Sequence, residues 1–295
     1  MTHTYQGAGT FTATLTVSDG HTPPVTRSVT VAVSSQGPSG FDIQLVYVNP
    51  PNDPAVRQAF ENAAARWARV ITGDLPDVQA DLPANSCGNP SDYRRTVDDL
   101  VIFVSVKTID GSGGILGQAG PCYLRSSSFL PYAGTMQFDA ADLGWMKNNG
   151  TLERVVLHEM GHVLGLGTLW DGVFHLLDYD TTRCQDATTV TYHGSDAVAA
   201  CRALGGSGQV PVEESGGAGT KCGHWREATF GDELMTGWIR SGDQAPLSKV
   251  TVGGLADLGY AVDDAAADPY QLPSGATPQG VGFEIKEILL RPRLP

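Results

Sequence analysis

The residues best suited to chemistry form the pentapeptide His-Glu-Met-Gly-His at positions 158–162. Because His158 and His162 are four residues apart, a helix would place both imidazoles on one face, where they can bind the same metal ion. Neutral imidazole is a good zinc ligand. Glu159 would lie on an adjacent face, able to take a proton from a metal-activated water and later deliver it to a leaving amine. The pattern therefore predicts a catalytic zinc site with Glu159 as general base and acid.

Two histidines leave this predicted site one protein ligand short. The compact motif HExxHxxGxxH has a glycine turn and then a third histidine, which here would be residue 168. Gly165 occupies the turn position and is expected to end the helix, but residue 168 is a threonine. The third ligand must therefore come from elsewhere in the chain. The candidates are the histidines His175, His193 and His224 and, for a glutamate ligand, Glu213, Glu214, Glu227 and Glu233.

The elements that would position this motif can be predicted from hydrophobic periodicity. Residues 151–165 have apolar side chains at helical spacing and predict an amphipathic helix. Residues 52–71 predict a second amphipathic helix, with Asn52 or Asp53 as its N-cap. Period-two or apolar patterns predict strands at 41–48, 98–109 (central in its sheet), 135–139 and 283–290. We expect a glycine-rich loop at 111–120, and a long irregular region at 166–223 with one short helix at 195–204.

The first 35 residues have a different character. Alternating apolar and threonine residues on either side of an Asp-Gly-His-Thr-Pro-Pro turn predict a β-hairpin of half-buried strands. The stretches His3-Thr-Tyr, Gly9-Thr-Phe-Thr and Leu15-Thr-Val-Ser-Asp resemble the end of a PKD domain, an Ig-like β-sandwich. This resemblance implies a truncated β-sandwich fragment, and we expect the natural chain to begin upstream of Met1. The predicted divisions are a hairpin at 1–35, a linker at 36–40 and a main domain at 41–295.

Charge and cysteine content limit the expected partners and location of the protein. The formal net charge of −13 would repel phosphate backbones, so nucleic acid is not an expected partner. No run of 18 apolar residues exists, so no membrane-spanning helix is predicted. Scattered cysteines without a CxxC pair favour disulfides, and hence a secreted protein, although residues 1–20 lack a signal peptide's apolar core. Cys87 and Cys122 flank the strand predicted at 98–109 and form a plausible pair. Cys184, Cys201 and Cys222 could form one further bridge, and Asp171, Asp178 and Asp180 could bind calcium.

Residues 223–237, Gly-His-Trp-Arg-Glu-Ala-Thr-Phe-Gly-Asp-Glu-Leu-Met-Thr-Gly, resemble the segment of leishmanolysin-like metallopeptidases that supplies a distant third histidine and then a Met-turn. The similarity extends over most of 41–262. Carried over position by position, it implies that His224 is the third zinc ligand and that Met235 packs beneath the metal. It also implies an α+β metzincin fold, with a twisted mixed sheet, a back helix and an active-site helix. The strand at 135–139 would then be the sheet edge to which an extended peptide adds.

These observations favour a secreted, monomeric, zinc-dependent endopeptidase acting on proteins or peptides. One alternative is a secreted binding or adhesion protein on a peptidase scaffold, which the PKD-like stretch would suit but which would not need Glu159. Another is a zinc hydrolase of a non-peptide substrate. No tyrosine lies two residues after Met235, so a stabiliser of the reacting carbonyl is not evident. The indole N–H of Trp238 could donate such a hydrogen bond, although a place in the core or the cleft wall suits it better.

Overall fold

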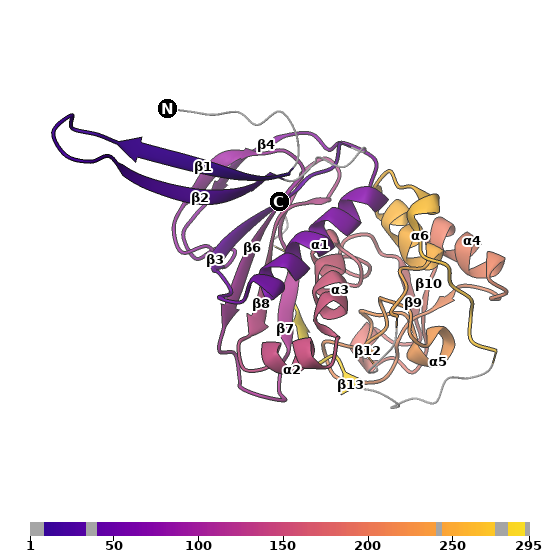
Figure 1. Cartoon of the computed structure of the whole chain (residues 1–295). Helices are drawn as coiled ribbons and strands as arrows, with labels where there is room; N and C mark the ends of the chain where they lie inside the picture. The colour runs from indigo at the N-terminus through magenta and orange to yellow at the C-terminus, as the bar shows by residue number, and fades with distance from the viewer. Residues whose placement is uncertain (1–8, 34–39, 240–243, 275–282, 293–295) are drawn as a thin grey trace.

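A five-stranded mixed sheet forms the centre of the computed structural model, which describes residues 9–33, 40–239, 244–274 and 283–292 (Figure 1). Its strand order is β14-β7-β8-β6-β3, in which β3, β6 and β8 are parallel, β7 is antiparallel to β8, and β14 is parallel to β7. The strands are β3 (Ile43–Asn49), β6 (Leu100–Lys107), β7 (Gly117–Leu124), β8 (Pro131–Asp139) and β14 (Glu287–Leu289).

The sheet has a core on each face, as a central, almost wholly apolar β6 requires. Successive side chains of a strand point to opposite faces. Ile102 and Val104 accordingly enter the main core, while Val101 and Phe103 enter a smaller core on the other side. Two helices cover the main core, and a hairpin covers the smaller one. These elements are α1 (Pro54–Val70) and α3 (Leu152–Leu164) on the first face, and β4 (Val78–Leu82) and β5 (Tyr93–Val97) on the second.

Both helices begin and end close to their predicted limits. The side chain of Asp53 caps α1 by accepting a hydrogen bond from the backbone N–H of Ala55 at 2.9 Å. Gly165 ends α3 in the left-handed region, with φ of 113°, which glycine adopts without strain. The buried indole of Trp67 donates to the carbonyl of Leu157 at 3.0 Å and joins α1 to α3. Helix α3 is therefore fixed against both the sheet and α1.

The C-terminal half is more regular than its sequence indicates. The region predicted as irregular holds a small antiparallel sheet, in which β10 lies between β9 and β11, followed by helices packed against one another (Figure 1). The short helix expected at 195–204 is confirmed as α4. Outside this half, the short helix α2 (Leu143–Asn148) precedes α3. The elements of the C-terminal half are β9 (Leu177–Tyr179), η1 (Cys184–Asp186), β10 (Val190–Tyr192), α4 (Ser195–Ala203), β11 (Val210–Pro211), α5 (Glu227–Phe230), β12 (Trp238–Ile239), α6 (Lys249–Leu258), η2 (Asp264–Ala266) and β13 (Phe283–Glu284).

Two expectations about the sheet are wrong. The glycine-rich loop gives way at Gly117 to β7, because glycines here allow close backbone approach instead of forming a turn. The strand expected at 135–139 is longer and lies between β7 and β6, so it is an interior strand and not the sheet edge. On that side of the sheet β7 is followed by β14, which is the edge strand.

The N-terminal hairpin pairs β1 (Gly9–Val17) with β2 (Val25–Val33), as its alternation predicts. Its strands are not half-buried, however. Large apolar side chains remain exposed because no second layer covers them in the described part of the chain; they are Leu15, Val17, Val25 and Val29. The proposed domain divisions therefore stay predictions. No helix among the described residues is long and apolar enough to cross a membrane.

Candidate metal centre

Three histidines from two distant parts of the chain meet in the core. His158 and His162 lie on one face of α3, and His224 follows the insertion 62 residues after His162. All three side chains are almost fully buried. Their Nε2 atoms form a triangle with sides of 3.0, 3.1 and 3.1 Å. Two nitrogen ligands of one tetrahedral zinc ion would lie about 3.3 Å apart, so the spacing fits a single ion.

Backbone carbonyls fix the tautomer of each ring. The Nδ1 atoms lie 2.7 Å from the Leu234 carbonyl for His158, and 2.8 Å from the Leu166 carbonyl for His162. For His224 the partner is the carbonyl of Thr220, at 2.9 Å. A carbonyl oxygen can only accept, so each Nδ1 carries the proton and donates it. In the neutral form of each ring, Nε2 then presents its lone pair to the centre of the triangle, which is the arrangement that metal-binding imidazoles adopt.

A fourth group at this centre was not predicted. The carboxylate of Glu287, from β14, lies 2.9 Å from Nε2 of His224, 3.4 Å from that of His162 and 3.5 Å from that of His158. Its side chain is fully buried, and a metal ion could be held by all four residues. Nothing in the sequence pointed to this residue, because it is a single glutamate in a short strand with no motif around it.

The four groups would be unfavourable together without a cation. Lone pairs of Nε2 atoms face one another and the Glu287 oxygens, and neither of those oxygens has a hydrogen-bond partner. Buried polar atoms left unpaired in this way cost free energy. A dication at the centre would satisfy all of them, and imidazole with carboxylate is a donor set that zinc accepts. The chemistry of the residues therefore fits one zinc ion.

Glu159 lies next to this cluster. Its carboxylate is buried, neither oxygen has a hydrogen-bond partner among the described residues, and a Cβ at Gly117 of β7 would stand 3.0 Å from Oε1. Burial raises the pKa of Glu159 well above its usual value, and the negative charge of Glu287 raises it further. Burial also lowers the pKa of His162 well below its usual value, which keeps that imidazole neutral. Glu159 is thus a buried carboxyl group that lies close to the cluster and has a raised pKa.

The sequence of this region matches a known peptidase family. The profile of the leishmanolysin family (peptidase M8) matches residues 91–277, well over half of the chain. This chain belongs to the leishmanolysin family. Its curated relatives include leishmanolysins of Leishmania donovani (29% identical over 166 residues), Leishmania chagasi (28% over 194) and Leishmania major (28% over 208). These alignments cover 55%, 64% and 69% of this chain but only 27%, 31% and 33% of the relatives, so the chain spans about a third of their length.

The mixed sheet with its three-histidine cluster is consistent with a metzincin-type domain of the leishmanolysin peptidase family. The matched region contains both the pentapeptide and His224. It ends at residue 277 and does not include Glu287.

Met235 packs against helix α3 in this leishmanolysin-family fold. Its side chain is fully buried, and a Cβ at Gly161 would come within 2.9 Å of its sulfur. Glycine at 161 therefore lets the methionine approach the helix between the two histidines. The backbone N–H of Met235 donates to the buried carboxylate of Glu233 at 2.6 Å, which fixes the turn. This position suits the packing role expected for Met235.

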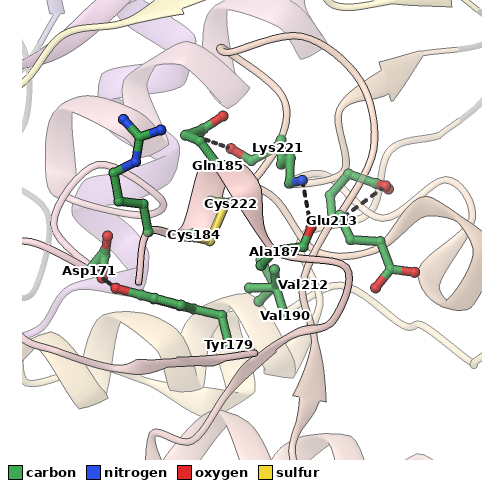
Figure 2. Close-up of a disulfide and its surroundings, with 12 residues drawn as sticks. Asp171, Tyr179, Cys184, Gln185, Ala187, Val190, Val212, Glu213, Lys221 and Cys222 are labelled. Carbon is green, nitrogen blue, oxygen red and sulfur yellow. Dashed lines mark hydrogen bonds between the residues drawn. A yellow bond between two sulfur atoms is a disulfide. The ribbon is translucent and has the colours of Figure 1, made fainter. Parts of the chain in front are cut away.

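A disulfide helps to position His224. The leishmanolysin-family chain pairs Cys184 with Cys222, two residues before the histidine (Figure 2). Around the bridge, the ammonium of Lys221 donates to the Ala187 carbonyl at 2.6 Å, and the N–H of Cys222 donates to the Glu213 carbonyl at 2.9 Å. The bridge and these bonds tie the insertion to the segment that carries His224.

The remaining cysteines form a second disulfide and one free thiol. The predicted Cys87–Cys122 bridge is confirmed, and Cys201 is left as a buried free thiol. Two disulfides are consistent with an extracellular or surface protein of the leishmanolysin family.

His175 and His193 are exposed and lie outside the metal cluster. The four glutamates considered as ligands also lie outside it: Glu213 and Glu233 accept hydrogen bonds from backbone N–H groups, Glu214 pairs with Arg226, and Glu227 is buried in α5.

We expect the Cys184–Cys222 bridge to matter for zinc as well as for stability. Replacing both cysteines with serine should lower the free energy of unfolding by about 3–4 kcal/mol, the entropy of a loop of this length, and weaken zinc binding. Urea unfolding and zinc competition with a chelator would measure the two effects. Cys87→Ser/Cys122→Ser is the matched control, because its loop is nearly as long and lies on the far face of the sheet. Equal loss of zinc affinity in both double variants would contradict the positioning role.

Proposed function

We propose that this chain is a zinc-dependent endopeptidase in which His158, His162 and His224 hold the metal and Glu159 handles protons. The observation that carries the proposal is the convergence of three deprotonated Nε2 atoms beside an unpaired, buried carboxylate. Membership of the leishmanolysin family supports it. The curated relatives that the chain matches are named leishmanolysins or a leishmanolysin homologue, but the chain spans only part of their length.

The reaction we propose is attack of water on a peptide carbonyl. Zinc, when bound, supplies Lewis acidity that polarises the carbonyl and lowers the pKa of water. Glu159 accepts a proton from the attacking water at one carboxylate oxygen and later donates it to the leaving nitrogen. Its exclusion from solvent helps, because an acid and base of this kind works best with a pKa near the working pH. The Nδ1 bonds to backbone carbonyls keep the three imidazoles in one orientation throughout.

The proposed substrates are proteins or extended peptides that pair with β7 next to Glu159, at the position that β14 occupies in this structure. We further propose that the enzyme is secreted and acts as a monomer, without a nucleic-acid partner. Trp238 lies in β12, where its backbone pairs with Glu284, and its role as a hydrogen-bond donor to the peptide carbonyl stays a prediction. Calcium binding at Asp171, Asp178 and Asp180 also stays a prediction.

The test is cleavage of casein or a quenched fluorescent peptide by the full chain, followed by metal removal. We expect measurable cleavage, its loss after treatment with 1,10-phenanthroline, and recovery when one equivalent of zinc is added. Metal content before and after would be read by atomic emission. Cleavage that continues in the metal-free chain, or no cleavage of any peptide by a chain holding one zinc, would contradict the proposal.

The alternative is a binding or adhesion protein on a peptidase scaffold. It would account for the exposed apolar hairpin and for the PKD-like residues of its strands. The family match covers residues 91–277 and does not include this hairpin. It gives no reason for an unpaired carboxylate beside three histidines. A chain that binds zinc and a protein ligand but leaves every peptide intact would favour this alternative.

A further inference from the structure

The C-terminal segment 283–291 crosses the face of the metal centre. β13 pairs with β12 on one side, and β14 pairs in parallel with β7 on the other, so the segment bridges the two halves of the fold (Figure 1). Hydrogen bonds from both sides fix it: Ile285 N–H donates to the Gly237 carbonyl, and Leu290 N–H donates to the Ala119 carbonyl, each at 2.9 Å. Without this segment, β7 would be the free edge of the sheet.

The surface beneath the segment is built mostly of backbone. A Cβ at Gly219 would stand 2.2 Å from the Glu287 carbonyl oxygen, and one at Gly120 would stand 2.3 Å from that of Leu290. A Cβ at Gly223 would stand 2.4 Å from a methyl group of Leu289. Real side chains do not make contacts this short, so glycine at these positions leaves a channel the width of an extended chain. Pairing with β7 through main-chain hydrogen bonds is the way in which a sheet edge binds an extended peptide.

The channel is not filled by the segment alone. A cavity of about 410 Å³ borders Glu287 and the Gly217–Thr220 loop, and a second, of about 430 Å³, borders Phe283, Trp145 and the glycines before β7. Both cavities have residues of the segment as one wall. The segment thus lies along a cleft with room for other side chains, instead of being an interior strand of a closed core.

Contacts at both ends hold the segment. Before the metal, Oε1 of Glu284 accepts from the Gly217 N–H at 3.0 Å and from the Thr220 hydroxyl at 2.8 Å. After it, the guanidinium of Arg291 donates to the carbonyls of Gly167 and Thr168, in the turn that follows α3. Between these two contacts the buried Glu287 carboxylate meets the three imidazoles. None of these contacts is covalent.

We propose that segment 283–291 is an internal inhibitor, which lies where an extended substrate would lie and closes the metal's open position with Glu287. This inference rests on the peptidase function proposed above. The group that faces the metal is a side-chain carboxylate and not a peptide carbonyl, so the segment places no scissile bond at the reacting point. Catalysis then requires the segment to leave the channel. An enzyme whose competent state is only 1–10% populated shows an apparent affinity reduced by about 10- to 100-fold.

The decisive measurement is hydrogen exchange of the segment in the full chain, with and without zinc. Glu159→Gln would serve as the parent, so that self-cleavage cannot remove the segment. We expect zinc to slow exchange of amides in residues 285–290 by about tenfold or more, because the metal holds Glu287 in place. Adding Glu287→Gln should abolish this zinc dependence. Glu284→Gln is the matched control: it makes the same change three residues earlier but keeps an oxygen acceptor for Gly217 and Thr220, so zinc should still slow exchange.

Peptide turnover provides the second readout, with Glu159 intact. Both Glu287→Gln and Arg291→Ala should raise kcat/KM by about tenfold, because each frees the channel in a different way. The inference is overturned if zinc does not change hydrogen exchange in the parent and neither variant changes turnover. The peptidase proposal would still stand in that case. If zinc slows exchange through Glu287 but no variant cleaves any peptide, the peptidase proposal fails while the contact between Glu287 and the metal stands.

Discussion

Replacing Glu159 with glutamine should reduce kcat for peptide cleavage by about 10³-fold while the chain still binds one zinc ion. Glutamine has nearly the same shape but cannot accept and return a proton. The three imidazoles would keep their places, because backbone carbonyls and not Glu159 orient them. Zinc stoichiometry and single-turnover cleavage, measured on the same preparation, would separate metal binding from proton transfer.

Glu153→Gln is the control for this variant. It makes the same substitution in the first turn of the same helix, at an exposed position whose side chain accepts a hydrogen bond from Asn62. Turnover by this control should match that of the unaltered chain. If Glu159→Gln retained turnover within a few-fold of the unaltered chain, Glu159 would have no part in proton transfer and the proposed mechanism would fail.

Replacing His224 with alanine should weaken zinc binding by about 100-fold or more, and peptide cleavage should fall with zinc occupancy. A ligand is expected to matter at least as much as the groups that orient ligands, whose loss typically costs 10- to 100-fold in metal affinity. Chelator competition would measure the affinity, and thermal unfolding of the metal-free forms would show whether the variant still folds. His193→Ala is the control, since His193 is exposed and lies outside the cluster.

Glu287 could act as a zinc ligand in place of His224 in this experiment. Two histidines and a glutamate form a complete zinc-ligand set in some peptidases, so His158, His162 and Glu287 could retain part of the zinc without His224. The double variant His224→Ala/Glu287→Gln should then bind zinc more weakly than either single variant. Full zinc affinity in the double variant would place the third ligand elsewhere and remove the basis of the proposed site.

The helix motif could be predicted because its information is local. The spacing of His158 and His162 and the helical periodicity around them are properties of a few consecutive residues, and Gly165 marks the end of the same helix. His224 is different. Nothing in a 62-residue separation says which of several histidines returns to the first two, and only the resemblance to a family singled it out.

Glu287 and β7 could not be predicted for two separate reasons. The alternation at 283–290 indicates a strand but not the strand that it pairs with, because pairing depends on contacts far away in the sequence. The glycines of β7 resemble a loop in composition, yet here they leave room for Glu159 and for the backbone of segment 283–291. These two unpredicted features, Glu287 and β7, lie on the same side of the metal centre. There the close approach of backbones, and not a side-chain pattern, determines the structure.

The carbonyls that hold the three imidazoles come from three separate stretches of backbone: the turn after α3, the loop beside the disulfide, and the segment just before Met235. The rings are therefore held in place by the folded chain itself. A metal ion entering such a centre restricts few further torsions, so little conformational entropy opposes its binding. The same arrangement means that movement of any one of these stretches turns one ring away from the other two. Metal affinity in this protein should thus report on the integrity of both halves of the fold at once.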